Sequence, residues 1–393
     1  MDHRTLQAWY AHRQGLLGNM EGLSNREVLA RTGWSRSIGG AGPYLGLFAR
    51  NRSSRKQIEA DLTALEIAEL PTARGCTYVL PKEEFSIGLS CGTKFIASTE
   101  VRTAKSLGVT EEEIENLKTK ILDALMDGPQ DPSGLKTLVG DASRNLGQEG
   151  KKKGLTTTMP LVLGLLQAEG KIIRKPLNGR LDSLRYAYAR WGGGITLSTP
   201  EEAYSEFAKR FFKWIGPATL TEFAGIAGIS NKGATAACEG LNLQPIDGTG
   251  LLLPASEHDA FHSFKAPKDP VYRLVCSVDG IVLHRWNIRP LLDEADYGQT
   301  MHSDGKTVEV GQSREIFHHA ILASGRIVGF WEYDSEAGEI VRHLFIPTNS
   351  DVEAEINRVT EFARDQLGDV RSFSLDSPES RKPKLAALRA ANG

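Results

Sequence analysis

One segment, Thr110–Trp191, constrains the fold most strongly, because its apolar spacing changes from helical to strand-like along its length. A capping-box start at Thr110–Glu113 precedes apolar residues that recur every three or four positions, namely Ile114, Leu117, Ile121, Leu122 and Leu125. This spacing predicts a first helix. We predict a second short helix from Asp131 through about Val139 and a third over Thr156–Glu169, which Gly170 ends.

A basic hairpin follows these three helices. Two predicted strands, Lys171–Lys175 and Leu184–Arg190, flank a loop with Asn178-Gly179 at its centre, a pair that favours a tight turn. Three helices and a hairpin predict a winged helix, in which the third helix can enter a DNA groove and the hairpin can contact the backbone. The candidate phosphate ligands of this module are Lys151, Lys152, Lys153, Thr156 and Arg180.

The charge distribution supports the same prediction. The chain carries 47 Lys and Arg against 49 Asp and Glu, a net charge of −2, yet Gly134–Arg190 holds eleven basic and four acidic residues. Trp331–Val370 reverses this balance, with ten acidic and three basic residues. Local basic surface, and not net charge, attracts phosphate, so the middle of the chain is the predicted DNA-contacting part. Solvated surface charge without a partner is the alternative.

Two other segments have weaker helix-turn-helix patterns. In the later one we predict helices and the remnant of a wing at Glu201–Ile215, Leu220–Gly228, Ser230–Leu241 and Leu251–Leu253. Few basic residues occur there, which favours a scaffold role. In the first segment we predict three helices and a two-stranded wing at Thr5–Leu16, Ser24–Arg31, Tyr44–Arg50 and Glu69–Leu80.

A glycine-rich connection, Gly33–Pro43, separates the second and third helices of the first segment. No Gly-Lys-Ser/Thr follows it, so it is not a P-loop, but glycines let a backbone approach a ligand closely. Arg36 and Ser37 are candidate phosphate ligands here, and Trp34 is a candidate for stacking on an unpaired base, with core packing as the alternative for the aromatic residue.

From about Pro270 the apolar period becomes two. This predicts an antiparallel meander with strands at Tyr272–Ser277, Ile281–Trp286, Ile316–Ala323, Arg326–Tyr333 and Glu339–Phe345. A helix at Asp351–Leu367 closes it, and a frayed tail follows from Asp376. The predicted fold class is therefore α+β. Three tandem winged-helix modules, at 1–100, 105–192 and 198–266, precede a C-terminal antiparallel β-domain at 267–375 and a tail at 376–393.

Several classes of protein are not indicated. The four cysteines, at positions 76, 91, 238 and 276, lack the spacing of metal ligands, so we expect free thiols, no metal site and no cofactor. No apolar run approaches the roughly 20 residues that span a bilayer, and the N-terminus lacks a signal pattern. We expect no membrane association, a cytoplasmic, nucleoid-associated location and a monomer.

Four segments, in their order and spacing, resemble one family: Gly42–Arg50, Ala73–Tyr78, Trp214–Ala224 and Gly325–Trp331. They are similar to the bacterial winged-helix DNA glycosylases of the AlkZ/YcaQ-like family, over about residues 4–346. The resemblance implies three winged helices in a C shape on a β-domain, with double-stranded DNA carrying alkylated or crosslinked bases in the channel. It also implies metal-free hydrolysis of the N-glycosidic bond of a cationic N-alkylpurine, a good leaving group.

The resemblance departs from the family at its catalytic pair, Gln-x-Gln or Gln-x-Asp. An ungapped alignment from Arg50 puts that pair on Arg36 and Ile38, and neither side chain can orient a water as an amide does. The histidine usual near the Arg-Gly strand is replaced by Tyr78. The resemblance thus carries over the scaffold and not the catalytic motif.

Further candidate residues follow from these family-like segments. Tyr44, Arg50, Arg74 and Tyr78 are candidate DNA contacts, with core packing or ion pairs at a module interface as alternatives. Asp279 is the weak catalytic candidate, and a turn-forming aspartate before Gly280 is its alternative.

The leading hypothesis is a winged-helix DNA-binding protein related to repair glycosylases that act on alkylated or crosslinked bases. Whether it hydrolyses the glycosidic bond, by residues other than the family's, stays open at this stage. A non-catalytic DNA-binding protein or a transcription regulator, whose β-domain senses a small molecule, is the alternative.

Overall fold

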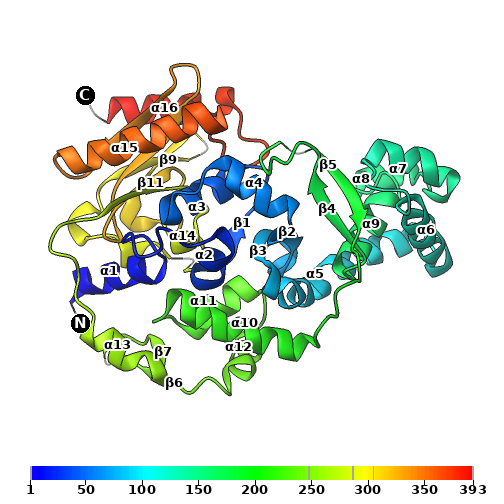
Figure 1. Ribbon diagram of the computed structural model, residues 1–393, viewed down its shortest axis with the longest axis horizontal. Coiled ribbons are helices and arrows are strands. Elements are labelled where there is room, and N and C mark those ends of the chain that lie inside the picture. Colours follow the sequence, from blue (N-terminus) through cyan, green and yellow to red (C-terminus); the bar gives the residue numbers. More distant parts are fainter. Residues whose placement is uncertain (1, 184, 247, 286, 304, 392–393) are drawn as a thin grey trace.

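The computed structural model describes residues 2–183, 185–246, 248–285, 287–303 and 305–391, and Figure 1 shows the arrangement of their helices and strands. The fold is mixed, with helices throughout and several antiparallel sheets, including one near the C-terminus. Within the described residues, no helix is both long and apolar enough to cross a membrane.

The first part of the chain is a helical layer on a three-stranded sheet of order β1-β3-β2. Its elements are α1 (His3–Arg13), α2 (Asn25–Thr32), β1 (Ser35–Arg36), α3 (Gly42–Asn51), α4 (Arg55–Thr63), β2 (Ile67–Pro71), β3 (Thr77–Pro81) and α5 (Phe85–Ser106). The three predicted helices and the two-stranded stretch are confirmed, and Ser24 forms the capping box of α2. The sequence analysis did not predict α4, although Ser54 and Gln57 form its capping box, or α5. The glycine-rich connection contains β1.

Two glycines explain how α5 lies against this sheet. A Cβ on Gly88 would come within 2.2 Å of Leu80 Cδ2, and one on Gly92 within 2.9 Å of the Pro71 carbonyl oxygen. Only glycine allows helix and hairpin to approach this closely. The same two glycines weaken the helical signal in the sequence, which is why α5 escaped prediction.

The middle of the chain contains the predicted three helices and hairpin, together with one further short helix. The elements are α6 (Glu111–Ala124), α7 (Pro132–Val139), α8 (Gly147–Lys152), α9 (Met159–Ala168), β4 (Ile172–Pro176) and β5 (Tyr186–Arg190). The Thr110 capping box is present. Lys151 and Lys152 end α8, which the sequence analysis did not predict. Leu184, where a predicted strand began, lies outside the described residues.

The next part continues with α10 (Pro200–Ile215), α11 (Leu220–Ala227), α12 (Asn231–Cys238), the hairpin β6 (Leu243–Pro245) and β7 (Leu252–Pro254), and α13 (His258–Ser263). The predicted helices and the wing remnant are confirmed. This part shares one hydrophobic core with the β1–β3 sheet, in which Trp34, Phe207 and Trp214 pack together.

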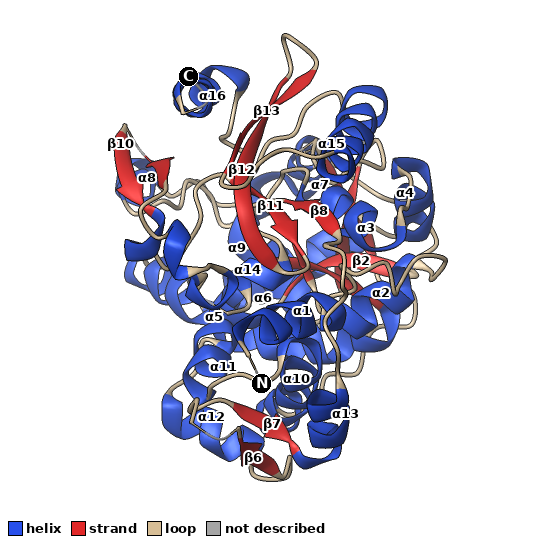
Figure 2. Ribbon diagram, turned by 90° about the vertical axis from the view of Figure 1, so that its left-hand side faces the viewer, coloured by secondary structure: helices blue, strands red, loops and turns tan. Residues whose placement is uncertain are grey.

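The C-terminal part is an antiparallel sheet of order β13-β12-β11-β8 with a helix on each face (Figure 2). Its elements are β8 (Tyr272–Val275), α14 (Gly280–Leu283), the hairpin β9 (Thr300–Ser303) and β10 (Lys306–Glu309), β11 (His319–Ala323), β12 (Arg326–Asp334), β13 (Glu339–Leu344), α15 (Ser350–Phe362), the π-helical turn Ala363–Leu367, and α16 (Pro378–Ala390). Successive side chains along each strand point to opposite faces of the sheet, so the sheet has a separate hydrophobic core on each face. Ile321 and Tyr333 pack with α15, and Leu322 and Phe330 pack with α16.

Two predictions for this part are wrong. Ile281–Trp286 was expected to be a strand, but Gly280–Leu283 form α14, because the Asp279 side chain accepts a hydrogen bond from the backbone N–H of Ile281 and caps the helix. Trp286 itself lies outside the described residues. The tail from Asp376 was expected to fray, but Ser377 caps α16, and Leu385 and Leu388 are buried in the core that α16 shares with the sheet.

Candidate functional site

The glycine-rich connection is an ordered part of the first sheet. Ser35 pairs with Val79 and Arg36 with Tyr78, so successive side chains alternate between the two faces of β1. Arg36 is half-buried, and its guanidinium carbon lies 5.1 Å from the centroid of the Tyr78 ring. Its Nη1 is buried without a hydrogen-bond partner in the part of the chain that the structure describes. The Arg36 guanidinium therefore makes a cation–π contact with the Tyr78 ring.

A distant segment, Arg371–Ser374, holds the rest of this connection. The backbone N–H of Ala41 donates to the Arg371 carbonyl at 2.8 Å, and that of Ser374 donates to the Ile38 carbonyl at 2.9 Å. A Cβ on Gly40 would lie 2.4 Å from the Ser372 carbonyl oxygen. The close backbone approach that the glycines suggested is thus made here to the chain's own C-terminal segment.

Ser37 points to the opposite side of β1 and is buried. Its hydroxyl donates to Glu69 Oε1 at 2.6 Å, and Arg174 Nη2 donates to Glu69 Oε2 at 2.7 Å. Glu69 is only 3% exposed, so Ser37 and the hairpin strand β4 meet at one buried carboxylate. Burial, with the Glu69 charge nearby, also raises the pKa of Tyr186 to about 12. The structure thus gives Ser37 an internal partner.

Arg50 and Asp279 form a buried, two-pronged ion pair. Arg50 Nη1 and Nη2 each donate to one Asp279 carboxylate oxygen at 2.8 Å, and Arg50 also bonds the Gly46 carbonyl and Gln14. Burial alone would raise the pKa of Asp279, but the Arg50 charge and its hydrogen bonds lower it below its ordinary value. Both carboxylate oxygens are occupied, which favours the structural alternative for Asp279.

The environment of this pair is apolar and tightly packed. A cavity of about 10 Å³ borders Asp279, with Arg50, Ser35 and Gly46 in its wall, and such a volume holds about one water molecule. Burial lowers the pKa of neighbouring His284 to about 4, against the opposing charge of Asp279. His284 is therefore a neutral imidazole at pH 7.

The candidate aromatic residues lie in the core. Trp34 is 2% exposed, stacks on Phe207 at 4.7 Å between ring centroids, and donates its indole N–H to Glu84 at 2.6 Å. The core-packing alternative is therefore correct for Trp34, and stacking on an unpaired base is not. Tyr44 is fully buried, and its hydroxyl accepts from the Leu181 backbone N–H at 3.0 Å. Tyr78 is 3% exposed beneath Arg36.

The remaining candidate residues differ in their exposure. Arg180 is engaged, since it makes two hydrogen bonds to Asp182, at 2.8 and 2.6 Å, and one to the Leu367 carbonyl at 2.8 Å. Arg74 is exposed, with a left-handed backbone at φ 61°. The exposed group on the middle part of the chain comprises Lys151, Lys152, Lys153 and Thr156. Within this group, Lys153 Nζ donates to Ser106 Oγ at 3.0 Å.

The structure therefore brings Arg36, Ser37 and Tyr78 together at the β1–β3 edge and joins Arg50 to Asp279. Sequence reasoning missed Glu69, Arg174 and the segment Arg371–Ser374. Arg174 and Glu69 are 105 residues apart in the sequence, and no local pattern marks such a pair.

Comparisons with known proteins decide the family. The sequence matches the family described as DNA glycosylase AlkZ-like over residues 37–362, most of its length. The chain belongs to the AlkZ-like DNA glycosylase family. Among solved structures, the fold is similar to that of Streptomyces sahachiroi DNA glycosylase AlkZ, with a TM-score of 0.70 and 19% sequence identity, over 94% of this chain and 98% of that one. No curated protein matches.

Family membership connects the chain to DNA repair and gives the sites above a context. The family-model match begins at Ser37, so it includes most of the glycine-rich connection, α3 and both members of the Arg50–Asp279 pair. The structural similarity at 19% identity concerns the fold alone. The chemistry of this chain must therefore be argued from its own side chains.

Proposed function

We propose that this family member binds double-stranded DNA and recognises damaged bases without hydrolysing the glycosidic bond at the family's catalytic position. The observation that carries the proposal is Arg36. It stands where the resemblance implies a catalytic amide, half-buried over Tyr78, with Nη1 unpartnered among the described residues.

The chemistry of a guanidinium fits binding and not hydrolysis. Arginine has five donors and no acceptor, so it cannot take a proton from an attacking water. Its planar fork matches a phosphate or the acceptor edge of a guanine. Ile38, at the second implied catalytic position, has no polar group at all. In this proposal Arg36 holds the DNA at the position where the implied amide would orient water.

The alternative acid, Asp279, is held in place by Arg50. An aspartate near the sugar could stabilise a developing oxocarbenium charge, but here both carboxylate oxygens accept hydrogen bonds from one guanidinium. The pair is neutral overall and buried. We infer that Asp279 caps α14 and fixes α3 against the C-terminal domain.

Tandem winged helices supply the wider DNA contacts in this proposal. The helix-and-hairpin units α6–β5 and α10–β7 have the composition of such modules, and the exposed group Lys151, Lys152 and Lys153 lies in the first of them. Each phosphate neutralised by a lysine releases counterions, which makes binding weaken as salt increases. Arg180 is already engaged by Asp182 and stabilises the hairpin.

Fluorescence anisotropy with a labelled duplex, over about 50–200 mM salt, tests the binding. We expect wild-type protein to bind at low salt, with a steep loss of affinity as salt rises. Arg36→Ala should bind at least several-fold more weakly, since hydrogen bonds to charged groups contribute about 1.5–3 kcal/mol.

Arg364→Ala is the matched control, because Arg364 is exposed and pairs with its neighbour Asp365 in the acidic part of the chain. It should leave binding unchanged. No binding by wild-type protein at 50 mM salt would end the proposal, and equal binding by Arg36→Ala would remove Arg36 from it.

A further inference from the structure

A cavity of about 250 Å³ lies in the C-terminal part, beside the segment that holds the glycine-rich connection. Its apolar wall comprises Val278, Val282, Leu283, Ile316, Phe317 and Phe373. The volume is just below the roughly 300–1,000 Å³ of sites for drug-sized ligands, so it suits a single small ring system. Phe373 is 42% exposed and lies at the rim, whereas Val282 and Ile316 are buried.

The cavity adjoins the site already described. A Cβ on Gly42 would lie 3.2 Å from Val278 Cγ2, and one on Gly40 would meet the Ser372 carbonyl. Val278 and Ser372, which both line the cavity, therefore pack directly on the glycine-rich connection that contains Arg36. A ligand in the cavity would be close to the proposed DNA contact.

The rest of the wall is polar. It comprises Arg314 and Glu315, and an end with the donors Ser277, Ser372 and Lys384. Ser277 Oγ and Ser372 Oγ are 3.4 Å apart, a long contact that leaves both hydroxyls capacity for another partner. Lys384 also lines the cavity. Its ammonium donates to the Phe317 carbonyl and lies 3.7 Å from Glu332 Oε1. An ammonium has three donors, so it retains capacity for a ligand.

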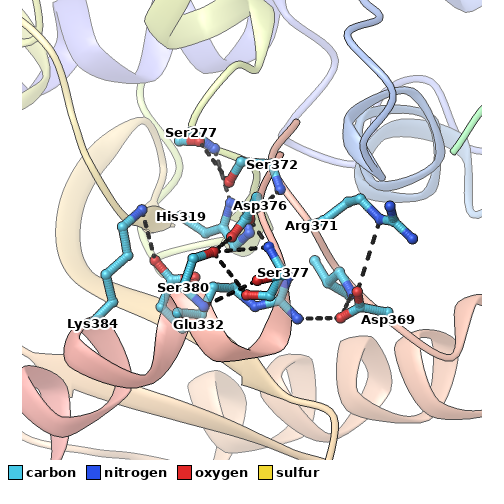
Figure 3. Close-up of polar contacts among 12 residues, drawn as sticks. Ser277, His319, Glu332, Asp369, Arg371, Ser372, Asp376, Ser377, Ser380 and Lys384 are labelled. Carbon is cyan, nitrogen blue, oxygen red and sulfur yellow. Dashed lines mark hydrogen bonds and ion pairs between the residues drawn. The ribbon is translucent and has the colours of Figure 1, made fainter. Parts of the chain in front are cut away.

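Buried groups behind this end hold it in place (Figure 3). Glu332 accepts from His318 Nδ1 at 2.9 Å, and His319 Nδ1 accepts from the Ser277 backbone N–H at 3.0 Å. Glu332 is fully buried, yet its pKa is lowered. Burial raises it, but the His318 hydrogen bond and the nearby positive groups outweigh burial. Glu332, through its contact with Nζ, orients the Lys384 ammonium at the cavity.

We propose that this cavity binds a neutral purine base by its acceptor edge. The ring would pack on Phe317 and Phe373, and its O6 and N7 would accept from Lys384 and the two serines. Lysine donating to O6 and N7 is a common contact to guanine, and aromatic side chains stack on any base. A purine alkylated at N7 is cationic and has lost that acceptor, so it could not make this pair of hydrogen bonds.

The base has two possible sources with the same chemistry. A base swung out of a duplex rests on the proposed function, because it requires DNA binding. A free purine nucleoside does not. The experiment therefore has one arm for each source.

In the first arm, isothermal titration calorimetry measures guanosine binding to the full chain. We expect about tenfold weaker binding in Phe373→Ala and in Lys384→Met. Two controls should bind guanosine as wild type does. They are Leu375→Ala, on the same loop and 83% exposed, and Lys382→Met, on the same helix and paired with Glu379. Phe373 is partly exposed at the rim, so Phe373→Ala should fold even if Lys384→Met, beside the buried Glu332, does not.

In the second arm, a duplex carries the fluorescent guanine analogue 8-vinylguanine, which keeps O6 and N7, opposite an abasic site. Its emission should rise when wild-type protein binds and should stay low with Phe373→Ala, while anisotropy shows both proteins on the duplex. Guanosine binding without duplex binding would support the cavity and refute the proposed function. Guanosine binding with a silent 8-vinylguanine duplex would assign the free base as the ligand. Duplex binding with neither signal would overturn the inference.

Discussion

The buried Arg50–Asp279 pair gives the sharpest stability prediction. Arg50 is 5% exposed and Asp279 is 4% exposed, and two hydrogen bonds of 2.8 Å join them. Asp279→Asn removes the charge and leaves the Arg50 guanidinium buried without its counterion. Breaking such a pair costs about 3–5 kcal/mol. Asparagine is also a good N-cap, so this variant keeps the hydrogen bond that begins α14.

A second variant separates the two roles of the carboxylate. Asp279→Ala loses the cap as well as the ion pair, so its free energy of unfolding should fall by about 1 kcal/mol more than that of Asp279→Asn. Urea unfolding followed by circular dichroism measures both. Combining Asp279→Asn with Arg50→Met should recover part of the loss, because no unpaired charge is then buried.

The pH dependence follows from the lowered pKa of Asp279. A carboxyl whose pKa is lower in the folded state stabilises the fold above its unfolded pKa of about 3.9 and loses that contribution as pH falls through the folded value. The difference in free energy of unfolding between wild type and Asp279→Asn should be largest at pH 7 and should shrink below about pH 4. A free energy of unfolding of Asp279→Asn within about 1 kcal/mol of that of wild type at pH 7 would show that Arg50 does not need this counterion.

Three further predictions concern packing and charge. Gly40→Ala should lower the Tm by several degrees, because its Cβ would meet two carbonyl oxygens at 2.4 and 2.5 Å. The control Gly298→Ala, whose Cβ would have nothing within 4 Å, should leave the Tm unchanged. Equal Tm values for the two variants would contradict this packing. Glu69→Gln should lower the free energy of unfolding more than Ser37→Ala does, since it leaves the Arg174 guanidinium without its counterion. Urea unfolding measures both variants, and the reverse order would show that the carboxylate is dispensable. Replacing Lys151, Lys152 and Lys153 together by alanine should reduce the slope of log affinity for duplex DNA against log salt by up to about 2.7, at unchanged Tm, and an unchanged slope would exclude these lysines from the contact.

Local signals in the sequence predicted the elements well where they were strong. The Thr110 capping box, the apolar spacing behind it and the Asn178-Gly179 turn correspond to α6 and the β4–β5 hairpin. The error at Ile281–Trp286 has a physical cause, because a short apolar run fits a strand and a buried helical turn equally well. Asp279 before Gly280 was the available helix-start signal, and it was interpreted as a turn.

Helix α16 was missed for a related reason. Its sequence is polar and contains Pro383, and only two apolar side chains, Leu385 and Leu388, face the sheet strongly. Its polar start and its place at the chain end favoured a frayed tail. The residues Lys384–Ala390 are nevertheless good helix formers, and the Ser377 cap and packing against β12 and β13 stabilise the helix.

The candidate site was only half predictable. Arg36 and Tyr78 were identified individually, but their stacking depends on the β1–β3 register. The partner of Arg50 is 229 residues away, and the support for the glycine-rich connection comes from Arg371–Ser374. Pairs of this kind arise from tertiary folding, so the sequence shows the residue types without their partners.

In our proposal, this glycosylase relative holds DNA at Arg36 without cutting the glycosidic bond there. A single-turnover assay tests it most directly, with protein in excess over a duplex that carries N7-methylguanine, at a salt concentration where anisotropy shows all DNA bound. We expect bound DNA and no abasic product. Abasic product from wild-type protein that Arg36→Ala abolishes would contradict it.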